Sequence, residues 1–103
     1  MSCNLDPSDK IILALDGMDP DESIKLVSKI DELIWVKVGL ELFMRAGPEF
    51  LQVLQSQRKK IFLDLKFHDI PITMSHACRQ AVKSGVELMT VHACAGSRAL
   101  LEA

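Results

Sequence analysis

The sequence repeats one pattern four times, and this repetition limits the fold more than any other feature. Apolar runs typical of buried strands open near residues 11, 34, 61 and 86. Segments with helical signals follow them, such as Phe50, Leu51 and Leu54 in an apolar stripe after Gly47-Pro48. Strands that alternate with helices about every 25 residues predict a parallel sheet with right-handed crossovers.

Local signals predict where the elements begin and end. We expect strands over residues 10–16, 34–39, 61–68 and 86–92, and later helices over 71–84 and 97–103. Asp19-Pro20 is a strong start for the first helix, with Asp19 as the cap and proline at the first helical position. Gly85 should end the third helix, whose expected inward residues are Met74, Ala77, Cys78, Ala81 and Val82.

The strand ends favour a barrel over an open doubly wound sheet. The charged or titratable residues Asp16, Lys37, Asp64, Lys66 and His92 all fall at or near predicted carboxyl ends. Those ends converge on one mouth in a barrel, and no Gly-x-Gly-x-x-Gly follows the first strand. We therefore predict an α/β chain of the (β/α)8 TIM-barrel family. Since a whole barrel needs about 250 residues, residues 10–103 should form its N-terminal half, about four β-α units, after a flexible leader over 1–9.

Composition excludes several classes of partner. The 103 residues carry a formal net charge of -2, which argues against nucleic acid or an anionic membrane. No apolar run approaches the roughly 20 residues of a membrane span, and the first ten residues do not resemble a signal peptide. Three cysteines and three scattered histidines give no disulfide framework and no metal-ligand spacing. We expect a cytoplasmic protein in which no zinc site can be recognised from the sequence.

The stretch from Ile61 to Pro71 carries the functional signal. One face of its predicted strand is apolar, whereas the other places Asp64 beside Lys66. Asp69 follows at the strand end, which gives Asp-x-Lys-x-x-Asp. Burying unpaired charges costs several kcal/mol, so charges kept on an inner face usually have a use.

In a barrel, Lys37, Asp64, Lys66 and Asp69 could form an alternating row of charges at one mouth. Each lysine would keep the neighbouring aspartates ionised, and each aspartate would keep the lysines protonated. A protonated lysine there is a positioned general acid, and flanking carboxylates would favour loss of a substrate carboxylate as carbon dioxide. The structural alternative is a salt-bridge network that closes the barrel end.

Other candidate residues have weaker signals. Asp16 either binds a sugar hydroxyl or caps the following turn, His68 is a solvated loop residue, and His92 either faces the mouth or is structural. A divalent metal on Asp64, Asp69 and His92 is disfavoured by Lys66 between them. We expect His76 and Arg79 on a helix surface, and Trp35 inside the barrel.

These residues resemble a known family over essentially the whole chain from Lys10 onward. Ala14-Leu15-Asp16, Val36-Lys37-Val38-Gly39, the run from Leu63 to Pro71 and Val91-His92-Ala93 have the order and spacing of orotidine 5'-phosphate decarboxylases. Asp-Leu-Lys-Phe-His-Asp-Ile-Pro is highly specific to that family. Related phosphosugar aldolases and synthases share Asp-x-Lys-x-x-Asp but lack the second-strand lysine, so Lys37 favours the decarboxylase.

The resemblance implies a homodimeric, cofactor-free barrel that converts orotidine 5'-monophosphate to UMP and carbon dioxide in pyrimidine biosynthesis. By analogy Lys66 protonates the pyrimidine, Asp64 destabilises the carboxylate of the substrate, and Lys37 orients Asp64 and the ribose. Asp16 binds the ribose. Asp69 reaches the partner's site, accompanied by Ile70 and Thr73.

The sequence departs from the family pattern in two ways. Ile72 stands where many members have Asn. In the family, the residues that bind the phosphate and those that contact the edge of the pyrimidine come from later strands and loops, which this sequence does not contain. We therefore expect the chain either to self-associate or to belong to a longer product. A non-catalytic half-barrel module is the alternative function.

Overall fold

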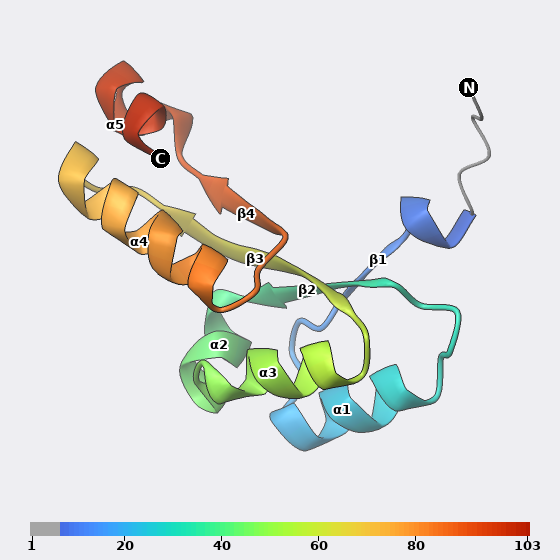
Figure 1. Cartoon of the computed structure of the whole chain (residues 1–103). Coiled ribbons are helices and arrows are strands. Elements are labelled where there is room, and N and C mark those ends of the chain that lie inside the picture. The colour runs from blue at the N-terminus through green and yellow to red at the C-terminus, as the bar shows by residue number, and fades with distance from the viewer. Residues whose placement is uncertain (1–6) are drawn as a thin grey trace.

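The computed structural model describes residues 7–103, which alternate strands with helices as expected (Figure 1). The strands are β1 (Ile12–Ala14), β2 (Trp35–Gly39), β3 (Lys60–Phe67) and β4 (Leu88–Val91). The helices are α1 (Pro20–Ser28), α2 (Leu40–Ala46), α3 (Glu49–Ser56), α4 (Pro71–Lys83) and α5 (Ser97–Glu102), with short 3-10 helices η1 (Pro7–Lys10) and η2 (Ala93–Ala95). Of the predicted leader 1–9, residues 1–6 lie outside the described residues, and Pro7 begins η1.

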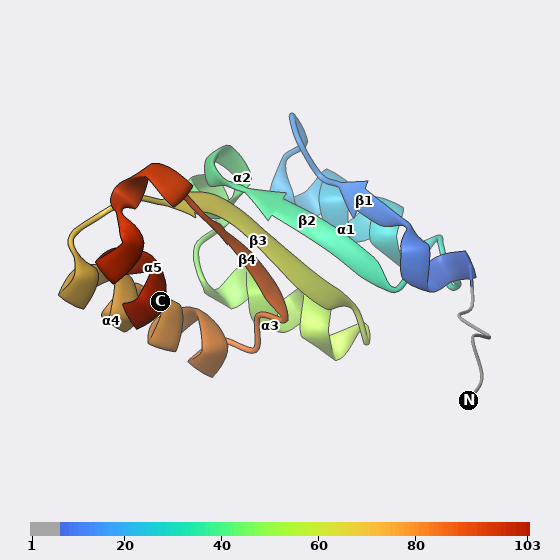
Figure 2. The same ribbon diagram turned by 90° about the horizontal axis from the view of Figure 1, so that it is seen from above.

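All four strands are parallel and lie in the order β1-β2-β3-β4 (Figure 2). Each strand therefore pairs with the next one in the chain, with no reversal of strand order. A doubly wound sheet has such a reversal at its switch point, whereas a (β/α)8 barrel adds strands in sequence. The order confirms the prediction of about four β-α units of the barrel family.

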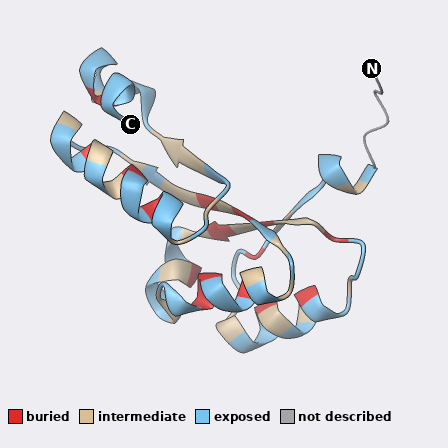
Figure 3. Cartoon of the chain, viewed as in Figure 1, coloured by how far each residue is buried: buried red, intermediate tan, exposed pale blue. Residues whose placement is uncertain are grey.

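The sheet has one covered face and one open face. Helices α1 and α3 lie beneath the sheet in Figure 1, and the buried residues cluster between these layers (Figure 3). Val36, Val38, Ile61 and Leu63 supply the strand side of that core. Their neighbours along the strands alternate to the opposite side. We call this opposite side the open face; it carries Ile12, Ala14, Trp35, Lys37, Phe62, Asp64 and Leu88.

Several local predictions are confirmed by the helix ends. Asp19 caps α1, since its Oδ1 accepts the N–H of Glu22 at 2.8 Å, and Pro20 is the first helical residue. The stripe of Phe50, Leu51 and Leu54 is buried. Gly85 follows α4 with φ +81°, a left-handed conformation that favours glycine.

Two details of the helices differ from expectation. Val82 was predicted to point inward, but it is 69% exposed because it lines a groove between α4 and α5 and does not pack in the core. Helix α2 was not predicted. It begins at Leu40 directly after β2, and Gly39 at its N-cap has no side chain with which to cap it, so the sequence lacks the usual start signal. No helix within residues 7–103 is long and apolar enough to cross a membrane.

Candidate active site on the open face

The candidate site is built around a break in the pairing of β3 with β4. Leu63 pairs with Met89 and Phe67 with Val91, so three residues of β3 face the single residue Thr90. Lys66 lies in this bulge with φ +55°, a left-handed conformation that is uncommon for a residue with a side chain. Its backbone N–H donates to Thr90 Oγ1 at 2.9 Å. The threonine hydroxyl thus accepts the hydrogen bond that a backbone carbonyl of β4 would accept in a regular sheet.

Bulges of this kind re-aim side chains, and here the bulge brings Lys66 back toward Asp64. Lys66 Nζ lies 2.9 Å from Asp64 Oδ1, and Thr90 Oγ1 donates to the same oxygen at 2.8 Å. The Lys66 side chain is 62% exposed, whereas that of Asp64 is 13% exposed. The ammonium group is therefore held in place and remains accessible from the open face.

Lys37 connects Asp64 to a second carboxylate. Its Nζ lies 3.5 Å from Asp64 Oδ2 and 3.3 Å from Asp16 Oδ2. A Cβ at residue 39 would stand 3.1 Å from Asp16 Oδ1, so Gly39 leaves the room that the Asp16 carboxylate needs. The result is an alternating row of charges in the order Asp16, Lys37, Asp64, Lys66, which we call the charged row.

Neighbouring charges fix the protonation of the row. The hydrogen bond from Lys66, with the one from Thr90 and the attraction of both lysines, lowers the pKa of Asp64 below its ordinary 3.8 despite partial burial. The hydrogen bond with Asp16, with the charges of Asp16 and Asp64, raises the pKa of Lys37 above 10.5 against the opposing effect of burial. At neutral pH the row therefore contains an ionised Asp64 and a protonated Lys37.

The structure places the remaining candidates at the turn between β3 and α4. Asp69 Oδ1 accepts the backbone N–H of Ile70 at 2.7 Å, and among residues 7–103 Asp69 forms no ion pair. The row expected from the sequence included Asp69; in the structure Asp16 takes the fourth position instead. Ile70 and Ile72 are each 61% exposed, and Thr73 is exposed on the first turn of α4.

The two histidines that follow β3 and β4 lie together. The rings of His68 and His92 stack with centroids 5.1 Å apart, and Cys94 contacts both. Within the described part of the chain, these three residues are the one group of three potential metal ligands whose ligand atoms lie within 4.8 Å of one another. A metal site on Asp64, Asp69 and His92, the weaker sequence alternative, is therefore wrong.

The remaining candidates are a tryptophan on the open face and two residues on the surface of α4. Trp35 is half-buried on the open face, where Lys60 Nζ lies 5.5 Å from its ring centroid. His76 and Arg79 are exposed on α4. None of these three belongs to the charged row.

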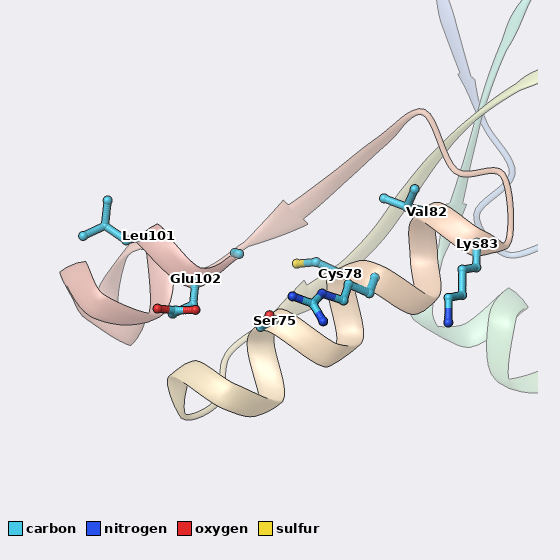
Figure 4. Close-up of a pocket in the computed structure, with 8 residues that line it drawn as sticks. Ser75, Cys78, Val82, Lys83, Leu101 and Glu102 are labelled. Atoms are coloured by element: carbon cyan, nitrogen blue, oxygen red, sulfur yellow. The ribbon is translucent and has the colours of Figure 1, made fainter.

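Two cavities on the helical side are weaker candidates. A groove of about 390 Å³ lies between α4 and α5, lined by Ser75, Cys78, Val82, Leu101 and Glu102 among others (Figure 4). A second cavity of about 420 Å³ lies between β3, α3 and α4, with an apolar lining that includes Leu51, Leu63 and Leu65. No residue of the charged row lines either cavity, so the open face remains the candidate site.

Thr90 is the residue of the charged site that sequence reasoning missed. It sits in a run of strand residues, and nothing in its local pattern distinguishes it from a packing residue. The only available signal was its position two residues before His92, near the end of a strand whose neighbour carries Asp64 and Lys66.

Comparisons with known proteins identify the family of the chain. The family model described as "Orotidine 5'-phosphate decarboxylase / HUMPS family" matches residues 9–103. Curated orotidine 5'-phosphate decarboxylases from Synechococcus sp. (strain CC9605) and Prochlorococcus marinus (strain MIT 9211) are 61% and 60% identical over 92% and 96% of this chain. The chain covers 39% and 41% of those two proteins, so it spans well under half of their length.

Solved structures give the same result for the fold. Orotidine 5'-phosphate decarboxylase from Lactobacillus acidophilus matches with a TM-score of 0.81 and 40% identity, over 89% of this chain and 42% of that one. The enzyme of that name from Pyrococcus horikoshii OT3 matches with a TM-score of 0.80 and 25% identity, over 88% of this chain and 45% of that one. The four β-α units therefore superpose on less than half of each of these proteins.

Proposed function

The chain belongs to the orotidine 5'-phosphate decarboxylase / HUMPS family, and we propose that it carries the charged catalytic groups for converting orotidine 5'-monophosphate to UMP and carbon dioxide. The observation that carries the proposal is the position of Lys66. Its ammonium group is accessible on the open face, yet held 2.9 Å from an ionised carboxylate. A cation placed in this way is a ready proton donor.

In the proposed reaction, the bond between the pyrimidine ring and its carboxylate breaks. Carbon dioxide leaves, the electron pair stays on the ring carbon, and the Lys66 ammonium protonates that carbon. The lysine then regains a proton from solvent. No further reactant is needed, because the proton replaces the lost carbon dioxide on the same carbon.

Asp64 supplies the repulsion that favours this step. Its pKa is lowered, so it remains charged when a substrate carboxylate approaches. Repulsion between the two carboxylates is present in the ground state and disappears as the substrate loses its charge, which lowers the barrier. Lys37 acts as a positioning residue, because it holds Asp64 on one side and Asp16 on the other. Asp16 is proposed to contact the ribose.

We also propose that the protein acts as a homodimer in the cytoplasm, with Asp69, Ile70 and Thr73 contributing to the partner's site. Two features support this arrangement. Asp69 has no counter-ion among residues 7–103, and the large apolar side chains Ile70 and Ile72 follow it in exposed positions. Exposed apolar groups around a polar residue are typical of surfaces that a partner covers.

The proposal is tested by the release of carbon dioxide from orotidine 5'-monophosphate labelled at its carboxyl carbon. Asp64→Asn keeps the shape of the side chain but removes its charge, so we expect at least about a 100-fold loss of rate, the scale on which single electrostatic groups act. Asp31→Asn, which changes an exposed aspartate outside the row, should keep the wild-type rate. Equal rates in wild type and Asp64→Asn would contradict the assignment.

A further inference from the structure

We propose that His68, His92 and Cys94 form a binding site for one zinc ion, at the end of the sheet beside the charged row. The three side chains come from different segments: His68 follows β3, His92 follows β4, and Cys94 lies in η2. Their ligand atoms all lie within 4.8 Å of one another. Nothing in the proposed decarboxylation uses any of the three, so this inference stands apart from the proposed function.

The distances fit tetrahedral coordination. Cys94 Sγ lies 3.9 Å from His68 Nδ1 and 3.7 Å from His92 Nδ1. Zinc bonds of about 2.0 Å to nitrogen and about 2.3 Å to sulfur, at the tetrahedral angle, place the two ligand atoms about 3.5 Å apart. Both sulfur–nitrogen distances therefore need to shorten by only a few tenths of an ångström. All three side chains are exposed, so an ion can reach them, and water can provide the fourth ligand.

The backbone holds two of the ligands in place before any ion binds. The N–H of His92 donates to Phe67 O at 2.8 Å, which joins the two strand ends that carry the histidines. The N–H of Ala95 donates to His92 O at 3.1 Å, and this turn folds Cys94 back toward the rings. The two rings stack at an interplanar angle of 29°, and both have their Nδ1 atoms within 4 Å of the Cys94 sulfur.

Hydrogen bonding alone satisfies both contacts of Cys94 only when the two histidine rings adopt opposite tautomers. One thiol proton can be donated to only one of the two Nδ1 atoms, so the second contact requires the other ring to adopt the opposite tautomer. A single cation can accept a lone pair from each of the three ligand atoms at once. Two imidazoles and a thiolate are ligands that zinc favours, and binding would transfer the thiol proton to the buffer.

A bound ion would connect the loop after β3 to the loop after β4. His68 is two residues from Lys66 and adjacent to Asp69 in sequence. Zinc at this position would therefore restrain the corner that carries both residues. No local pattern in the sequence indicates this cluster, because positions 68, 92 and 94 are brought together only by the parallel pairing of the two strands.

Cobalt binding tests the site directly, since tetrahedral cobalt with a thiolate ligand has visible bands and a near-ultraviolet charge-transfer band. We expect one cobalt ion per chain with both features, displaced by one equivalent of zinc. In competition with a coloured chelator, Cys94→Ser and His92→Asn should weaken zinc binding by more than the roughly 10–100-fold that loss of an outer-shell partner costs. Cys3→Ser and His76→Asn are the matched thiol and imidazole controls and should bind as wild type does.

Alkylation of the wild-type chain provides a test that needs no variant. Zinc should slow the reaction of Cys94 with iodoacetamide and leave that of Cys3 unchanged, as measured by peptide mass. Absence of the thiolate-to-cobalt band, unchanged zinc affinity in Cys94→Ser, or equal protection of both cysteines would each overturn the proposal.

Discussion

The backbone N–H of Lys66 donates to the side-chain oxygen of Thr90 at 2.9 Å, and the same threonine hydroxyl donates to Asp64 at 2.8 Å. Thr90 therefore supports both the left-handed backbone of Lys66 and the carboxylate that Lys66 contacts. A residue in a left-handed conformation costs about 1–3 kcal/mol unless its surroundings stabilise it. Thr90 provides that stabilisation from the neighbouring strand.

Replacing this hydroxyl should affect stability and activity together. Thr90→Val keeps the shape of the side chain but leaves the Lys66 N–H and one Asp64 contact without a partner. We expect a loss of about 1–3 kcal/mol in the free energy of unfolding, measured by urea denaturation, and a lower decarboxylation rate. Thr90→Ser retains the hydroxyl and is the matched control. A Thr90→Val variant as stable as wild type would show that the bulge does not depend on this hydroxyl.

The charged row predicts a particular dependence of stability on pH. Because the folded pKa of Asp64 lies below 3.8, its ion pairs stabilise the fold above that pH. This contribution is lost as the pH falls from about 3.8 through the folded pKa. Asp64→Asn has no such contribution to lose. The difference in unfolding free energy between wild type and Asp64→Asn should therefore be largest near neutral pH and shrink in acid.

The exposed Asp31 provides the reference for this measurement. The difference between wild type and Asp31→Asn should stay nearly constant across the same range, because no ion pair joins Asp31 to the described residues. A difference for Asp64→Asn that grows toward low pH would contradict the assigned direction of the pKa shift.

The open face predicts self-association of the 103-residue chain. Within residues 7–103, β1 and β4 are edge strands, and Ile12 and Leu88 are 42% and 45% exposed on the face opposite the helices. Apolar faces and unpaired edges of this kind favour pairing with another chain. We expect light scattering to give a mass greater than that of one chain.

A charge on the open face should reverse this association. Leu88→Lys places an ammonium group on that face and should lower the mass, whereas Leu101→Lys changes an exposed residue of α5 and should not. A folded wild-type monomer would rule out self-association.

The fold was largely predictable because its signals are local. The alternation of Ile61, Phe62, Leu63 and Asp64 assigns each residue to a face of the strand, and Asp19 with Pro20 fixes a helix start. The spacing of the charged residues at successive strand ends was also enough to favour a barrel. The strand and helix assignments use only residues close together in the chain, and the barrel inference needs only the positions of the predicted strand ends.

The details that the sequence did not reveal depend on contacts between distant residues. The bulge at Lys66 depends on a hydrogen bond to the Thr90 side chain. Asp16, and not Asp69, belongs to the charged row because Lys37 on β2 contacts the carboxylate that follows β1. The cluster of His68, His92 and Cys94 likewise appears only when two strands are paired. Helix α2 lacked a local signal because Gly39 cannot cap it.

The central claim is that Lys66 donates the proton and is not needed to hold the fold together. The most direct test follows the ultraviolet loss of orotidine 5'-monophosphate with wild type, Lys66→Ala and the exposed-lysine control Lys83→Ala, while circular dichroism reports the fold. Exposed ion pairs contribute about 0–1 kcal/mol, so Lys66→Ala should remain folded and lose turnover, whereas Lys83→Ala keeps both. Turnover in Lys66→Ala equal to that of wild type, or absence of turnover in folded wild type, would contradict the claim that this chain carries a working proton donor at Lys66.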